Sequence, residues 1–173
     1  MRPSTVLTVA ALSGIPALAA LGLALTLHHG PRELTFSDQG VNVALRLSGD
    51  GDRLVTTFTP QRPGFHLYSV GLPAAGIGGL GRPTRVEVAG SLRSRGPLVA
   101  EAPVRMLSMQ GTDAVFPVYP DGPVTTELPV AVDAHGDARV LVSYAACSPQ
   151  ECLMPVIGHP VEIPAAALAS MRG

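Results

Sequence analysis

Cys147 and Cys152 are the only cysteines of this 173-residue chain, and four residues separate them. The intervening segment 148–151 is suited to a turn, which can bring the two Cα atoms to the roughly 4.4–6.8 Å that a disulfide needs. The loop that such a bond would close is short, and the stabilisation expected from a disulfide grows with loop length. The pair is therefore either a local structural disulfide or a redox-active dithiol, and the short loop weakens the first reading.

The surroundings of the two cysteines predict a weakly activated dithiol. Thiol–disulfide exchange proceeds by thiolate attack through a mixed disulfide, at a rate that depends on thiolate fraction and access. No helix start follows Cys147 and no Lys or Arg lies between the cysteines, so two common ways of lowering a thiol pKa are missing. Glu151 would disfavour a thiolate beside it. These features favour a relay protein whose cysteine pair is attacked by the thiolate of a more reactive partner.

The N-terminus predicts export from the cytoplasm. Arg2 precedes an apolar, uncharged stretch at positions 6–27, and Ala17-Leu-Ala19 would serve as a small-x-small cleavage site. The stretch is also long enough to span a membrane as an anchor. We therefore expect residues 1–28 to be a signal peptide or membrane anchor and the protein to work in the periplasm or cell envelope, where disulfides persist.

The rest of the chain predicts one all-β domain at residues 33–173. Apolar and polar residues alternate with a period of two, and turn signals separate the runs. The predicted strands are 41–47, 53–59, 84–88, 124–132, 138–144 and 159–163, with a short helical candidate at 164–170 and a long loop at 71–83. Short strands at this spacing indicate an antiparallel β-sandwich or barrel. The net charge of −1 gives no electrostatic case for a nucleic-acid partner.

Four segments follow one another in a familiar order: Pro63-Gly-Phe-His-Leu-Tyr-Ser69, Gly76-Ile-Gly-Gly-Leu-Gly-Arg-Pro-Thr84, Tyr144-Ala-Ala-Cys147 and Cys152-Leu-Met-Pro155. Together they resemble the amino-terminal periplasmic domain of the thiol:disulfide interchange protein DsbD and its single-domain relatives. The resemblance spans roughly residues 33–163. It implies an immunoglobulin-like sandwich whose two cysteines carry electrons from a thioredoxin-like or membrane electron-transfer donor to oxidised envelope proteins.

The resemblance also implies roles for particular residues. Cys147 and Cys152 match the active pair of the family, with one residue fewer between them than its better-known members have. Phe65 and Tyr68 match aromatic positions near that pair, although both could equally be core residues. We expect a cap loop that shields the cysteines within 106–112, with Met109 as a partner-contact or shielding residue.

Position suggests which cysteine is the more accessible. Cys147 ends a predicted strand, where neighbours such as Tyr144 can shield its sulfur. Cys152 follows the turn and precedes the apolar residues Leu153-Met-Pro155, which could form a contact surface. We therefore expect Cys152 to be the accessible thiol and Cys147 the shielded one.

His66 and His159 are further candidate ligands, because zinc and copper both accept thiolate and imidazole. Their spacing from the cysteines matches no standard metal pattern, so the sequence predicts no metal site and no cofactor, and both histidines are interpreted as surface residues. Met106, Met109 and Met154 could be soft copper ligands, but isolated methionines more often fill gaps or form apolar contact surfaces.

Two functions of different classes remain open. The first is a protein-disulfide reductase component, with Cys147 and Cys152 cycling between dithiol and disulfide. The second is a non-catalytic immunoglobulin-like envelope module that uses its disulfide only for local rigidity. The reduction potential separates them, since structural disulfides typically lie below about −300 mV.

Overall fold

The strands of this protein show alternating buried and more exposed side chains. The structure is a computed structural model, and it describes residues 32–108, 113–133 and 135–172. In β2 (Val41–Leu47) and β11 (Ala138–Tyr144), buried side chains alternate with more exposed ones. This follows from the period of a strand, whose successive side chains point to opposite faces of the sheet.

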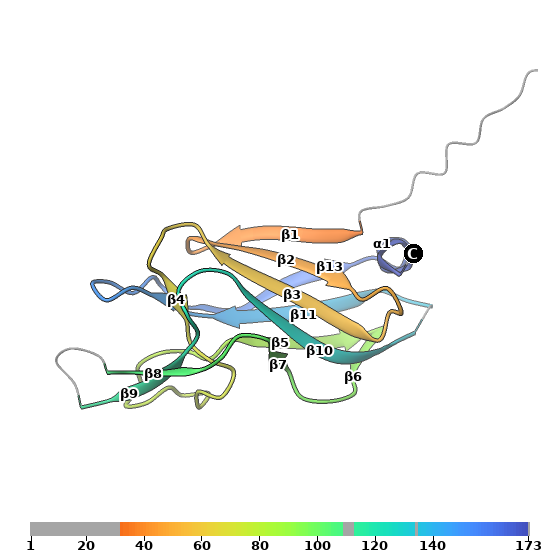
Figure 1. The fold of residues 1–173 in the computed structure, drawn as a ribbon. Coiled ribbons are helices and arrows are strands. Elements are labelled where there is room, and N and C mark those ends of the chain that lie inside the picture. Colours follow the sequence, from red (N-terminus) through yellow and green to blue (C-terminus); the bar gives the residue numbers. More distant parts are fainter. Residues whose placement is uncertain (1–31, 109–112, 134, 173) are drawn as a thin grey trace, which may run out of the picture.

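Two antiparallel sheets pack face to face as a sandwich (Figure 1). The larger has the strand order β1-β2-β3-β10-β6, with β7 also paired to β10, and the smaller has the order β13-β11-β5. Their other strands are β1 (Glu33–Asp38), β3 (Arg53–Pro60), β5 (Arg85–Gly90), β6 (Leu92–Ser94), β7 (Val99–Ala100), β10 (Val124–Val132) and β13 (Val156–Ile163).

The main core lies between the two sheets. Leu45 and Phe58 enter it from the larger sheet, and Val140 and Val142 enter it from the smaller sheet; all four are fully buried. Burying a side chain of this size contributes about 1.5–3 kcal/mol, so this layer holds the sheets together and fixes the positions of the strand ends.

Two short pairs of strands lie at one end of the sandwich, and the helix α1 (Ala165–Met171) lies at the other (Figure 1). β4 (His66–Leu67) pairs with β12 (Ala146–Cys147), and β8 (Arg105–Ser108) pairs with β9 (Val115–Val118). A second, smaller core sits at this end and is formed by Tyr68, Leu72, Phe116, Val118, Ala145 and Cys147. The cysteines therefore belong to an end of the sandwich with a core of its own.

The predicted architecture is confirmed: the protein is an all-β, immunoglobulin-like antiparallel sandwich with one short helix. All six predicted strands and the C-terminal helix are present, with boundaries shifted by up to three residues. The strands β1, β4, β6, β7, β8, β9 and β12 were not predicted. All of these except β1 have only two to four residues, too few to show alternation, whereas β1 does alternate and was missed. Residues 71–83 form the expected loop.

The predicted signal or anchor segment, residues 1–28, lies outside the described residues. Within the part of the chain that the structure describes, no helix has the length and apolar character to cross a membrane. That residues 1–28 form a signal peptide or a membrane anchor stays a prediction.

Candidate functional site: a half-exposed disulfide

Cys147 and Cys152 form a disulfide across a tight hairpin turn. Ser148 N–H donates to Glu151 C=O on one side of the pair, and Leu153 N–H donates to Ala146 C=O on the other. The two cysteines are thus directly opposite each other as a non-hydrogen-bonded pair of an antiparallel ladder. In such pairs the Cα atoms approach more closely than in hydrogen-bonded pairs. Their Cα separation of 4.0 Å is accordingly shorter than the range used for the sequence prediction.

The two sulfur-bearing residues differ in exposure. Cys147 ends β12 with only 4% of its surface exposed, whereas Cys152 is exposed. Cys147 is on β12, which pairs with β4, and its side chain belongs to the second core, so neighbouring residues cover it. Cys152 follows the turn and is not part of that core. The expectation that Cys152 is the accessible member of the pair is confirmed for the disulfide form.

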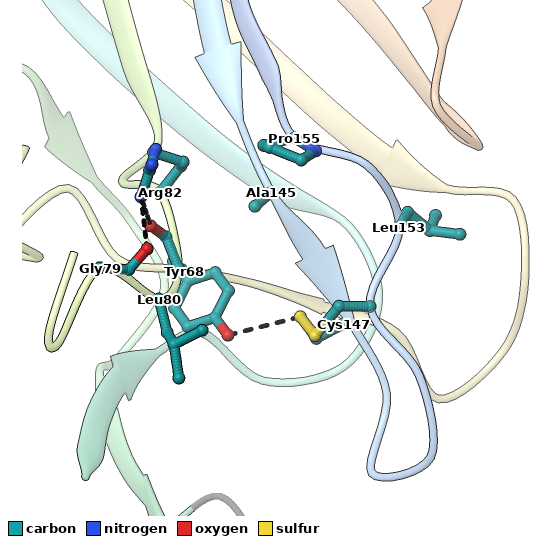
Figure 2. Close-up of a pocket in the computed structure, with 10 residues that line it drawn as sticks. Tyr68, Gly79, Leu80, Arg82, Ala145, Cys147, Leu153 and Pro155 are labelled. Carbon is teal, nitrogen blue, oxygen red and sulfur yellow. Dashed lines mark hydrogen bonds between the residues drawn. A yellow bond between two sulfur atoms is a disulfide. The ribbon is translucent and has the colours of Figure 1, made fainter. Parts of the chain in front are cut away.

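Tyr68 contacts the buried cysteine directly. Its hydroxyl oxygen lies 3.4 Å from Sγ of Cys147 (Figure 2). Because a disulfide sulfur carries no hydrogen, the phenol is the donor. Burial raises the pKa of Tyr68, so the hydroxyl keeps its proton at neutral pH and remains available to donate to a Cys147 thiolate after reduction. A hydrogen bond to a charged acceptor is stronger than one to a neutral acceptor.

An apolar cavity of about 260 Å³ lies beside the disulfide. Its walls include both cysteines, Tyr68 and Leu80, and Figure 2 shows the Tyr68 ring between Leu80 and Cys147. Arg82 also lines the cavity, and its guanidinium donates to the carbonyl groups of Gly79 and Gly81. The cavity can therefore receive an apolar side chain next to the disulfide.

Glycines allow the 76–82 segment to approach Tyr68. Ile77 and Leu80 exchange two backbone hydrogen bonds around Gly78 and Gly79, which both have positive φ, the conformation of a type I′ turn. Gly81 also has a positive φ of 74°, and a Cβ there would lie 3.0 Å from the Tyr68 ring. This close approach requires glycine.

Ion pairing changes the expected role of Glu151. Its carboxylate lies 2.6 Å from the Arg62 guanidinium, which also sits 4.4 Å above the Phe65 ring. The sequence argument considered only the negative charge of Glu151, which would disfavour a thiolate beside it, and the structure adds the Arg62 cation next to that charge. The fold supplies a cation from 89 residues away, and no local sequence signal points to that pairing.

His66 is buried, so its interpretation as a surface residue is wrong. It has 2% of its surface exposed and stands opposite Cys147 in the β4–β12 pair. Its Nδ1 lies 3.4 Å from Asp121, an ion-pair distance without hydrogen-bond geometry. Burial lowers the pKa of His66; the Asp121 carboxylate opposes this shift and Arg105 reinforces it.

The other predicted residues are dispersed. His159 stacks on Phe36 and pairs with Asp38, and it lines neither cavity at the disulfide. Phe65 and Tyr144 belong to the main core, and the Tyr144 hydroxyl donates to the Asp38 carbonyl. Burial and the nearby Asp38 raise the pKa of Tyr144. Of the aromatic candidates, Tyr68 is the one with a recorded contact to a cysteine.

The expected cap-loop segment, 106–112, falls partly outside the structure. Residues 109–112, Met109 among them, are not in the described part of the chain. Met106 is on β8 with 64% of its surface exposed, and Met154 beyond the cysteine turn is 70% exposed. A shielding or contact role for Met109 therefore stays a prediction. No group of three or more potential metal-ligating side chains occurs among the described residues.

Comparison with known proteins places two solved structures beside this chain. No family model and no curated protein matches it. The N-terminal domain of Neisseria meningitidis DsbD in its reduced form is similar with a TM-score of 0.49 and 13% identity, over 72% of this chain and 83% of that domain. The N-terminal periplasmic domain of Proteus mirabilis ScsB is similar with a TM-score of 0.47 and 15% identity, over 77% of this chain and 50% of that one. The first of these belongs to the family that the motifs of this sequence resemble.

Proposed function

We propose that this protein is an extracytoplasmic thiol–disulfide exchange domain that relays electrons through Cys147 and Cys152. The observation that carries the proposal is the asymmetry of the disulfide: one sulfur belongs to an exposed residue and the other to a residue buried against a phenol hydroxyl. A bond needed only for rigidity requires neither feature. An exchange centre benefits from both, because attack needs access and the displaced sulfur needs stabilisation.

Reduction proceeds in two balanced steps. A thiolate of the donor attacks Sγ of Cys152, which forms the donor–Cys152 disulfide, breaks the Cys147–Cys152 bond and releases Cys147 as a thiolate. The second thiol of the donor then loses its proton and attacks the donor sulfur of the mixed disulfide, which releases Cys152 as a thiolate. Both thiolates take up a proton, so the domain gains two electrons and two protons while the donor dithiol becomes a disulfide.

Two features of the site support the roles in this scheme. Cys152 is the cysteine that a folded donor can reach, since Cys147 is buried. Cys147 is the better leaving group, since Tyr68 can donate a hydrogen bond to its thiolate. Oxidation of the reduced domain by a client runs the same steps in reverse.

The partners follow from this chemistry. The donor is a thioredoxin-like or membrane electron-transfer protein, and the acceptors are oxidised proteins of the envelope. The exposed Met154 and the apolar cavity beside the disulfide support a protein partner with an apolar surface. In this proposal the protein works in the periplasm or cell envelope, secreted or anchored by residues 1–28, as a protein-disulfide reductase component without a cofactor.

The test is direct exchange with a reduced thioredoxin-like protein. Stoichiometric reduced donor is mixed with the oxidised domain, the reaction is quenched with acid, and the free thiols of each protein are counted. We expect reduction of the domain and a reduction potential well above about −300 mV. A potential below that value, together with no exchange with any thioredoxin-like donor, would leave the structural-disulfide module as the correct function.

A further inference from the structure

His66 lies beside the buried cysteine and has no part in the exchange scheme above. It is paired directly with Cys147 across the β4–β12 ladder. Opposite residues of an antiparallel pair project from the same face, with Cβ atoms about 4.5–5.5 Å apart. Both residues also line a second cavity, of about 130 Å³, together with Tyr68 and Ser148. His66 and Cys147 therefore line the same small cavity.

His66 is buried without a hydrogen-bond partner for Nδ1, which would lower the stability of the folded state if the residue served only for packing. Only 2% of its surface is exposed, and its Nδ1 has no hydrogen-bond partner among the described residues. Leaving a buried polar atom unpaired costs about 1–3 kcal/mol. An apolar side chain of similar size would fill the same space without that cost, so the imidazole calls for a chemical reason.

The charges around His66 suit a proton acceptor. Asp121 Oδ1 is 3.4 Å from Nδ1, and the same oxygen binds the Arg105 guanidinium. The other titratable groups that face this space are Tyr68 and Cys147. Burial lowers the pKa of His66, so the imidazole is neutral at neutral pH and has a free lone pair that can accept a proton. Once it accepts a proton, the neighbouring carboxylate stabilises the imidazolium, as in an Asp–His pair beside a nucleophile.

We propose that His66 accepts the proton of the Cys147 thiol when Cys147 closes the disulfide, a step that rests on the relay proposed above. After Cys152 has formed a mixed disulfide with a client, the Cys147 S–H proton moves to the imidazole and the Cys147 thiolate attacks Sγ of Cys152. The Cys147–Cys152 bond forms, the Cys152–client bond breaks, and the client sulfur leaves as a thiolate that takes up a proton. The imidazolium then releases its proton to water. In the reductive direction, the imidazole takes a proton from water and passes it to the displaced Cys147 thiolate.

A small aromatic disulfide, dithiobis(nitrobenzoate), separates the step in question from the first attack. One equivalent added to the reduced protein should give two phases of coloured thiol. In the first, Cys152 attacks the reagent; in the second, Cys147 displaces the remaining aromatic thiol from Cys152. The Cys147→Ala variant, which should show only the first phase, assigns them.

The His66→Gln variant should slow the second phase about tenfold at neutral pH and leave the first phase unchanged. A cysteine thiol in water is only a few per cent ionised at about pH 7, and Cys147 stays mostly protonated there even with the Tyr68 hydrogen bond, so removal of its proton limits the second phase. In the unmodified protein, the second phase should lose rate as pH falls through the lowered pKa of His66. In the variant, the rate should instead follow the ionisation of the thiol alone.

Two controls separate proton transfer from a packing role. Free imidazole should restore the second phase in His66→Ala, which a packing defect would not allow. His159→Gln removes the other described histidine with a carboxylate partner and should change neither phase. Equal second-phase rates and equal pH profiles in the unmodified protein and His66→Gln would overturn the role of His66 while the relay stands. If the unmodified protein shows no second phase, the relay and the role of His66 both fall.

Discussion

The hydroxyl oxygen of Tyr68 lies 3.4 Å from Sγ of Cys147, and both residues are buried in the smaller core of the sandwich. In the disulfide form this is a weak contact between a phenol and a sulfur. In the dithiol form the same hydroxyl can donate to a thiolate, and a hydrogen bond to a charged group is worth about 1.5–3 kcal/mol. The contact therefore stabilises the displaced sulfur more than the bonded one.

Tyr68→Phe should lower the thiolate fraction of Cys147 about tenfold at neutral pH, because about 1.4 kcal/mol corresponds to one pKa unit. The measurement is thiolate absorbance against pH in a background where Cys152 is replaced by Ala. Tyr144→Phe is the matched control, since it removes another buried hydroxyl whose acceptor is the Asp38 carbonyl. The same titration curve for Tyr68→Phe and its parent would show that the phenol does not stabilise the thiolate.

The two single-cysteine variants should behave differently toward a thioredoxin-like partner. Cys147→Ala keeps the exposed cysteine and should accumulate a mixed disulfide, whereas Cys152→Ala keeps only the buried one and should trap poorly. Non-reducing electrophoresis after mixing with a partner that lacks its own resolving cysteine measures both. Trapping only through Cys147 would reverse the assignment, and full exchange activity in both variants would exclude a dithiol mechanism.

Gly81→Ala should impair exchange as well as stability. A Cβ at this position lies 3.0 Å from the Tyr68 ring and 3.1 Å from Leu72, and a positive φ costs a residue other than glycine roughly 1–2 kcal/mol. Gly78→Ala is the matched control, because Gly78 also has a positive φ but meets no atom within 4 Å. In urea unfolding, the free energy of unfolding of Gly81→Ala should be about 1 kcal/mol or more lower than that of Gly78→Ala. Only Gly81→Ala should slow the reduction of the disulfide by dithiothreitol. Equal unfolding midpoints for the two variants would mean that the Tyr68 ring can move away from the added Cβ without loss of stability.

His66 should make the folded protein less stable in mild acid. Burial lowers its pKa from 6.5 in the folded state, so below about pH 6.5 the unfolded chain binds a proton that the folded chain does not. The stability that His66 contributes is thus fully present above that pH and is lost as pH falls toward the lowered pKa. Urea midpoints at about pH 7.5 and about pH 5.5 should fall further for the unmodified protein than for His66→Gln. Parallel decreases would show that the pKa of His66 is not lowered.

Met154→Asp should weaken exchange with a protein partner and spare exchange with a small thiol. Met154 is two residues beyond Cys152 and 70% exposed, so its side chain is placed to contact a partner that approaches the disulfide. We expect the second-order rate with a thioredoxin-like donor to fall severalfold, while reduction by dithiothreitol is unchanged. Val99→Asp is the control, because Val99 is also exposed but lies on β7, which pairs with β10 of the larger sheet. The same loss in both variants would indicate a general surface effect.

Local patterns in the sequence were sufficient to predict the sandwich and the turn that holds its cysteine pair. The period-two runs at 41–47 and 138–144 predicted strands that the structure contains, because a strand buried on one face must alternate. The spacing of Cys147 and Cys152 predicted a turn that can close a disulfide, and the apolar residues after Cys152 pointed to an accessible sulfur there. Each of these inferences involves residues close together in the chain.

Tertiary structure alone decided the environment of the disulfide. The pairing of β4 with β12 buried His66 beside Cys147, although nothing local distinguishes that histidine from a surface residue. An ion pair across 89 positions compensated Glu151 with Arg62. The same fold placed the Tyr68 hydroxyl, 79 positions away, against the buried sulfur. Burial, charge compensation and hydrogen bonding depend on which strand ends are neighbours in space. The packing of the two sheets around their shared core determines which ends these are.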